Sequence, residues 1–180
     1  MRRRALLGTL GTSVTAGCLG NILHDTRGVS RFTIDNDSVP EKFPAALSAE
    51  LLSEPTAEHP ARIRVRFEYT GDEPRSFRFS YPAPFADVLG IAADGSKLVL
   101  KYEADPGDHH DGCWWSKLSY GGTATENRRF DPGEGAHVEW SVLTHEAMES
   151  CYPSGSYRFE DEYTVVGRTY EWGFHLNVHE

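Results

Sequence analysis

Charged and apolar residues alternate without a break in the stretch Arg62-Ile63-Arg64-Val65-Arg66-Phe67-Glu68-Tyr69. Successive side chains of a β-strand point to opposite faces, so this alternation predicts a strand with one face in a core and the other in water. A turn sequence follows at residues 70–74, and the alternation resumes over residues 76–80. The stretch therefore predicts two consecutive strands joined by a turn.

Similar short runs recur along the chain. Residues 88–91 and 98–102 flank Ala93-Asp94-Gly95-Ser96, which predicts a hairpin. Further alternating runs lie at 138–142, 157–160 and 170–178, whereas 46–52 fits a short helix as well as a strand. Seven or eight short strands without a long helical period predict an all-β fold, an immunoglobulin-like antiparallel β-sandwich.

Several turn motifs occur in an order that resembles a known domain. After the strand at 62–69 come Thr70-Gly71-Asp72-Glu73-Pro74, Asp94-Gly95, Pro132-Gly133-Glu134 and Pro153-Ser154-Gly155-Ser156-Tyr157. This order resembles the immunoglobulin-like domain of the bacterial intracellular proteinase inhibitor family, a domain also common in archaeal lipoproteins. The resemblance covers roughly residues 62–159 and implies the fold. It permits protease inhibition as an activity but marks no inhibitory residue.

The first residues have the parts of an export signal. Arg2, Arg3 and Arg4 precede a mostly apolar stretch, and the pattern resembles a twin-arginine signal. The run Thr15-Ala16-Gly17-Cys18 resembles a lipobox, as in the lipoproteins of halophilic archaea. We therefore predict an export signal at 1–17 and a lipid anchor on Cys18, which would hold the protein on the extracellular face of the cell membrane. An uncleaved start, and cleavage without lipidation, remain alternatives.

The segment after the lipobox has no regular spacing of apolar residues. Residues 18–44 are predicted to form a flexible tether, and residues 45–180 the sandwich. Asn36-Asp37-Ser38 is an N-glycosylation sequon, which makes Asn36 a glycosylation candidate.

The chain has three cysteines, Cys18, Cys113 and Cys151. If Cys18 carries lipid, an even pair remains, and the outside of a cell is oxidising enough to join it. The cysteine count thus predicts a Cys113–Cys151 disulfide. Two unrelated buried thiols are the alternative.

The most unusual stretch is Asp105-Pro106-Gly107-Asp108-His109-His110-Asp111-Gly112-Cys113-Trp114-Trp115. Its imidazoles and carboxylates make His109, His110 and Asp111 weak candidates for a Zn²⁺ or Cu²⁺ site. The alternative is a solvated, turn-rich insertion held at Cys113. Of the neighbours Trp114 and Trp115, at least one is expected to pack on the core, and an exposed one could stack on a sugar or contact a protein.

Motifs of the common catalytic classes are missing from the sequence. It contains no Gly-x-Ser-x-Gly elbow, no His-Glu-x-x-His and no phosphate-binding glycine loop, so we expect neither catalysis nor a cofactor.

Eighteen basic and 27 acidic residues give a net charge of −9, which disfavours nucleic acid as a partner. Cleavage before Cys18 would leave 15 basic residues and a net charge of −12. Only four of the basic residues are lysine, as expected for a surface in high salt or for an arginine-rich genome.

Together these features predict a binding or structural role at the cell envelope. The expected partners are the membrane, through the lipid anchor, and an envelope protein or a glycan. A metal- or ligand-binding lipoprotein that uses the loop at 105–115, and an inhibitor of an extracellular protease, are the alternatives.

Overall fold

The computed structural model describes residues 31–102, 107–117 and 124–179. The predicted export signal and Cys18 lie outside these residues. Within them the chain forms twelve strands and no helix, and hence no helix that could cross a membrane. The strands are β1 (Arg31–Asn36), β2 (Ala45–Ser53), β3 (Ala61–Tyr69), β4 (Arg75–Ser80), β5 (Leu89–Ile91), β6 (Lys97–Tyr102), β7 (Asp108–His110), β8 (Cys113–Ser116), β9 (Thr125–Phe130), β10 (Gly135–His145), β11 (Gly155–Val165) and β12 (Arg168–His179).

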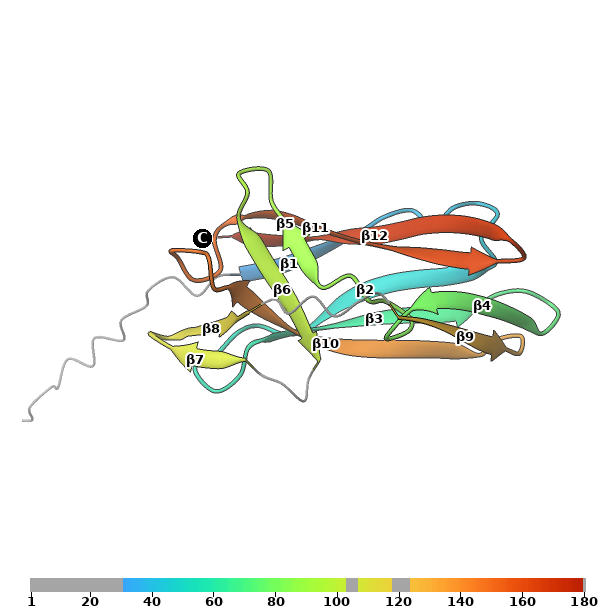
Figure 1. Ribbon diagram of the computed structural model, residues 1–180, viewed down its shortest axis with the longest axis horizontal. Coiled ribbons are helices and arrows are strands. Elements are labelled where there is room, and N and C mark those ends of the chain that lie inside the picture. The colour runs from blue at the N-terminus through green and yellow to red at the C-terminus, as the bar shows by residue number, and fades with distance from the viewer. Residues whose placement is uncertain (1–30, 103–106, 118–123, 180) are drawn as a thin grey trace, which may run out of the picture.

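The strands form two layers that face each other (Figure 1). One layer has the order β1-β12-β11-β4-β9, and the other has the order β2-β3-β10-β6-β5, with antiparallel neighbours throughout. A short pairing of β5 with β11 joins the layers on one side. Eight strands thereby make a nearly closed, barrel-like sandwich, which confirms the predicted all-β sandwich class.

The core lies between the two layers and is rich in aromatic rings. Phe67 of β3 packs against Phe77 and Phe79 of β4 and Phe130 of β9, with ring centroids 5.0, 5.2 and 4.9 Å away. The four apolar residues of the alternating stretch are all buried, as predicted: Ile63, Val65, Phe67 and Tyr69. Each contributes about 1.5–3 kcal/mol by leaving water.

The structure has more strands than the seven or eight expected. Segment 46–52, ambiguous in sequence, belongs to strand β2, with Leu47 buried and Ser48 exposed on opposite faces. The prediction did not include β1, β7, β8 or β9 as strands. Strand β9 shows why, because its only apolar residue is Phe130, and an edge strand with one apolar side chain carries no alternation.

The tether predicted for residues 18–44 differs from the structure at residues 31–36. These residues form β1, which pairs along its whole length with β12. Only Phe32 of β1 is fully buried, and its ring meets that of Tyr152 at 5.2 Å. Backbone pairing with a long neighbour, rather than hydrophobic periodicity, therefore makes this segment a strand.

Two carboxylates fasten the segment between β4 and β5 to β11. Asp161 accepts hydrogen bonds from Ser80 Oγ at 2.9 Å and from the backbone N–H of Ala86 at 2.7 Å. Asp87, from the segment itself, accepts one from the backbone N–H of Glu160 at 2.9 Å. Burial raises the pKa of both aspartates above the usual range.

Candidate functional site

The β7–β8 hairpin occupies one end of the sandwich, at the left of Figure 1. His110 pairs with Cys113, and the two residues between them are Asp111 and Gly112. Both have positive φ, 53° and 74°, the backbone of a tight hairpin turn that Asp-Gly favours. The sequence therefore makes a hairpin where a loop was expected.

Three contacts hold the hairpin on the body of the protein. The predicted disulfide between Cys113 and Cys151 is present and joins β8 to the segment before β11. Strand β8 also pairs in parallel with the end of β10, where Trp115 lies opposite Thr144. In addition, Trp114 Nε1 donates a hydrogen bond to the carbonyl oxygen of Thr56 at 2.9 Å. These contacts fix the orientation of the hairpin.

The two tryptophans have different surroundings. Trp114 is 9% exposed and belongs to the core cluster. Trp115 is only partly buried, and its Nε1 donates a hydrogen bond to the carbonyl oxygen of His110 at 3.3 Å. The structure thus places Trp114 in the core and leaves part of the Trp115 ring at the surface.

Each histidine of the hairpin stacks on a different tryptophan. The His109 ring lies 4.5 Å from that of Trp114, and the His110 ring lies 5.4 Å from that of Trp115, nearly parallel at 8°. Neighbouring side chains of a strand point to opposite faces, so the two imidazoles diverge. Asp111 Oδ2 lies 3.4 Å from His110 Nδ1. Among the described residues no three His, Cys, Asp or Glu side chains come together as a metal-ligand set, so His109, His110 and Asp111 are not assembled as one.

The glycosylation candidate Asn36 lies at the end of β1. Its Nδ2 donates a hydrogen bond to the carbonyl oxygen of Ala49 at 3.0 Å, and its Oδ1 accepts one from the Ala49 N–H at 2.6 Å. The side chain thereby connects the edges of β1 and β2. The amide nitrogen that a glycan would modify is thus part of the contact that brings the two layers together.

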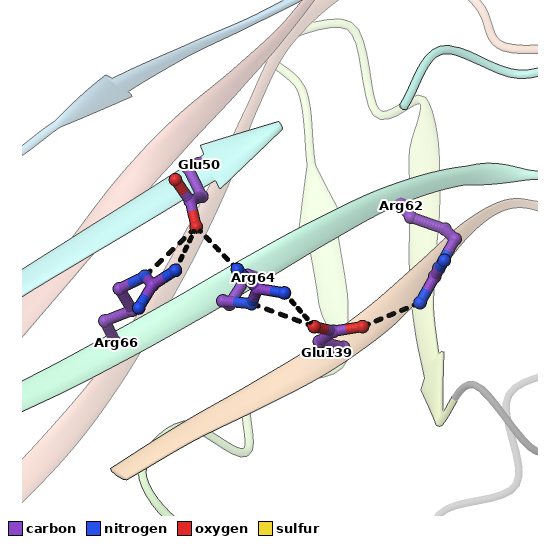
Figure 2. A network of polar contacts seen from close by, with 5 residues as sticks. All are labelled: Glu50, Arg62, Arg64, Arg66 and Glu139. Carbon is purple, nitrogen blue, oxygen red and sulfur yellow. Dashed lines mark hydrogen bonds and ion pairs between the residues drawn. The ribbon is translucent and has the colours of Figure 1, made fainter. Parts of the chain in front are cut away.

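The outer face of β2, β3 and β10 carries an ionic network that sequence analysis did not identify (Figure 2). Glu139 of β10 accepts hydrogen bonds from Arg62 Nη2 at 2.6 Å and from Arg64 Nε at 2.8 Å. Glu50 of β2 accepts them from Arg64 Nη1 at 3.2 Å and from Arg66 Nε at 3.0 Å. These hydrogen bonds lower the pKa of both glutamates.

The arginines of this network were visible as the polar half of the alternating stretch at 62–69. Their partners were not, because Glu50 and Glu139 become neighbours of Arg64 only through the register of β3 with β2 and with β10. Each of the three arginines is thus paired with a glutamate.

A polar depression of about 500 Å³ lies between the β5–β6 turn and the segment near Cys151. Its lining includes Asp94, Ser96 and Glu149. Asp94 already accepts two hydrogen bonds from Ser96, through the backbone N–H and the hydroxyl, both at 2.9 Å. Its carboxylate therefore serves the turn, and the β7–β8 hairpin remains the stronger candidate site.

Comparison with known proteins gives no match to any family model, curated protein or solved structure. The resemblance to the intracellular proteinase inhibitor family therefore depends on the turn motifs alone.

Proposed function

We propose that this chain is a lipid-anchored binding domain on the extracellular face of the cell membrane, without catalytic activity, and that its β7–β8 hairpin contacts a glycan or a protein of the envelope. The observation that carries the proposal is the stacked pair of His110 and Trp115 on a hairpin that a disulfide holds in place.

The hairpin suits binding because little of it has to become ordered on contact. The disulfide fixes its base, and the hydrogen bond from Trp115 Nε1 to His110 holds the two rings together. A preorganised aromatic surface loses little conformational entropy when a ligand binds. The His110 side chain is 59% exposed and that of Asp111 is 95% exposed, so polar groups lie beside the aromatic rings. Aromatic surface with adjacent polar groups is the usual composition of a sugar or protein contact.

The position of the hairpin supports contact with components close to the membrane. Strand β1 begins at the same end of the sandwich as the hairpin (Figure 1). The contact of Phe32 with Tyr152, next to Cys151, connects β1 to the disulfide. Arg31 comes thirteen residues after Cys18, a length of chain that spans at most about 45 Å. An anchor on Cys18 would therefore keep the hairpin near the membrane surface.

The binding part of the proposal is tested by photo-cross-linking on intact cells. A photoreactive side chain replaces Asp111, and a matched probe replaces Tyr81, an aromatic residue outside the hairpin that is 63% exposed. We expect a discrete cross-linked partner from position 111 that disappears with Trp115→Ala. The same products from both positions, or products that survive Trp115→Ala, would contradict the proposed site.

The anchor is tested separately, by mass spectrometry and fractionation of the Cys18→Ser variant. We expect this variant to leave the membrane fraction. Its retention there would exclude a lipid anchor on Cys18 and leave the hairpin proposal open to its own test.

A further inference from the structure

Two groups of arginines in this acidic protein differ in how their charge is compensated. Arg62, Arg64 and Arg66 of β3 are paired with glutamates (Figure 2). A second group belongs to β4 and β9 and consists of Arg75, Arg78, Arg128 and Arg129. Within the described part of the chain, none of these four makes an ion pair or a side-chain hydrogen bond. The β4–β9 pair thus carries uncompensated positive charge.

The register of β4 with β9 puts this charge on both sides of β9. Arg78 lies opposite Asn127, and Arg129 lies opposite Ser76, so Arg78 and Arg129 are diagonal neighbours on one face. Arg128 alternates to the other side of the strand and is also exposed. The one acidic residue of β9, Glu126, already accepts a hydrogen bond from the Ala83 N–H at 2.8 Å.

Strand β9 is also the edge of its layer. Among the described strands it pairs only with β4, and four of its six residues are exposed. In the described part of the chain, one edge of its backbone therefore has N–H and C=O groups without a neighbouring strand. Such an edge can accept an extended peptide by β-strand addition, in which backbone hydrogen bonds provide affinity and alternate side chains provide specificity.

The charge decides which strand can be added. A second copy of this chain would bring its own Arg128 and Arg129 against those of β9, and like charges on adjacent strands repel. An acidic peptide would instead place carboxylates next to Arg129 on one face of β9, or next to Arg128 on the other. Arginine binds carboxylates well because its planar group can donate two parallel hydrogen bonds.

We propose that β9 binds an extended, acidic segment of a partner protein by β-strand addition. The surface lies at the end of the sandwich away from the β7–β8 hairpin (Figure 1), so both contacts fit on one molecule. This proposal is independent of the function proposed for the hairpin.

The test uses the full chain and three labelled peptides: alternating Thr-Glu, alternating Thr-Lys, and a Thr-Glu peptide with proline at alternate positions. Fluorescence anisotropy measures binding, and amide hydrogen exchange measures protection of residues 125–130. We expect the Thr-Glu peptide alone to bind and to protect alternate amides of β9. Added salt should weaken the binding, because exposed charges are screened.

Variants locate the site. Arg128→Glu/Arg129→Glu should weaken binding roughly tenfold or more, since the side chains beside the added strand would then repel its carboxylates. Arg31→Glu, an exposed arginine of β1, is the matched control and should bind as the unmodified chain does. Arg128→Gln/Arg129→Gln, which only removes charge, should lie in between.

Three outcomes would overturn the proposal. The first is no binding of the Thr-Glu peptide at low salt by a folded chain. The second is equal binding of the proline-containing peptide, or binding without protection of β9, because either result means ionic contact without strand addition. The third is an equal loss of affinity with Arg31→Glu.

Discussion

The carboxylate of Asp161 accepts a hydrogen bond from the backbone N–H of Ala86, 2.7 Å away and 75 residues apart in the sequence. The same carboxylate accepts hydrogen bonds from Ser80 Oγ and from the N–H of Glu162, while Asp87 bonds in the opposite direction to the N–H of Glu160. The connection between β4 and β5 is therefore fixed to β11 by charged groups, in addition to the buried ring of Phe85 that packs against Phe174 of β12.

Removing the central carboxylate should destabilise the fold. Asp161→Ala leaves the donors of Ser80, Ala86 and Glu162 without this acceptor, and we expect the free energy of unfolding to fall by about 2–3 kcal/mol. Urea unfolding followed by tryptophan fluorescence measures the change. Asp72→Ala, at an exposed position in the β3–β4 turn, is the control and should be nearly neutral. Equal midpoints for both variants would show that the Asp161 contacts do not stabilise the fold.

The same carboxylates should make stability fall as pH rises. Burial raises the pKa of Asp161 and of Asp87 above 3.8, so the folded state holds their protons more tightly than the unfolded state. Their contribution is fully present below pH 3.8 and is lost as pH rises through the raised values. We expect this decline to shrink in Asp87→Asn/Asp161→Asn, measured as the urea midpoint between pH 3.5 and 7.

The glutamates of the ionic network change the stability with pH in the opposite direction. Their lowered pKa values mean that Glu50 and Glu139 contribute stability above pH 4.5 that is lost as pH falls. For this reason the test compares the double variant with the unmodified chain at each pH. An unchanged difference across the range would contradict the role of the two aspartates.

Loss of the disulfide should cost about 4 kcal/mol. The bridge joins residues 38 positions apart, and chain-entropy reasoning gives this value for a loop of that length. Cys113→Ser/Cys151→Ser should unfold at lower urea and show faster hydrogen exchange in β7 and β8. Free thiols at both positions in protein purified without reductant would refute the bridge.

Arg64 and Glu139 should show favourable coupling in a double-mutant cycle. Glu139 accepts hydrogen bonds from Arg64 and Arg62, so Arg64→Ala should cost less when Glu139 is already alanine. The coupling should weaken as salt rises, because both side chains are partly exposed, at 25% and 18%. Additive effects of the two substitutions at low salt would be the contrary result.

The two tryptophans of β8 should respond differently to replacement by phenylalanine. Trp114→Phe removes the hydrogen bond to Thr56 and leaves a void in the core, so we expect a loss of about 1–3 kcal/mol. Trp115→Phe should change stability little, since its ring is only partly buried. Equal losses, measured by urea unfolding, would place Trp115 in the core as well.

Local chemistry determined much of the fold in advance. Alternation over residues 62–69 specifies a strand because side chains on a pleated backbone change face at every residue. Gly95 and Gly133 have φ of 87° and 79°, which glycine adopts without strain, so the hairpin turns were also predictable. The Cys113–Cys151 pairing followed from the cysteine count. In the candidate site, Trp114 and Trp115 were recognised as neighbours that would differ in burial.

Long-range pairing was decided only in the folded chain. Glu139 meets Arg64, and Asp161 meets Ala86, because strand register and layer packing bring together residues 75 apart. Strand β9 also became apparent only in the folded chain, because its sequence shows no alternation and its arginines have no acidic partner among the described residues. The sequence was sufficient for the strands with clear alternation, for several turns and for the disulfide pair, since these depend mainly on neighbours along the chain, whereas β1, β7, β8 and β9 became strands only by pairing in the folded chain. The tertiary structure alone decided which charges are neutralised and which remain available to a partner, since that depends on neighbours in space.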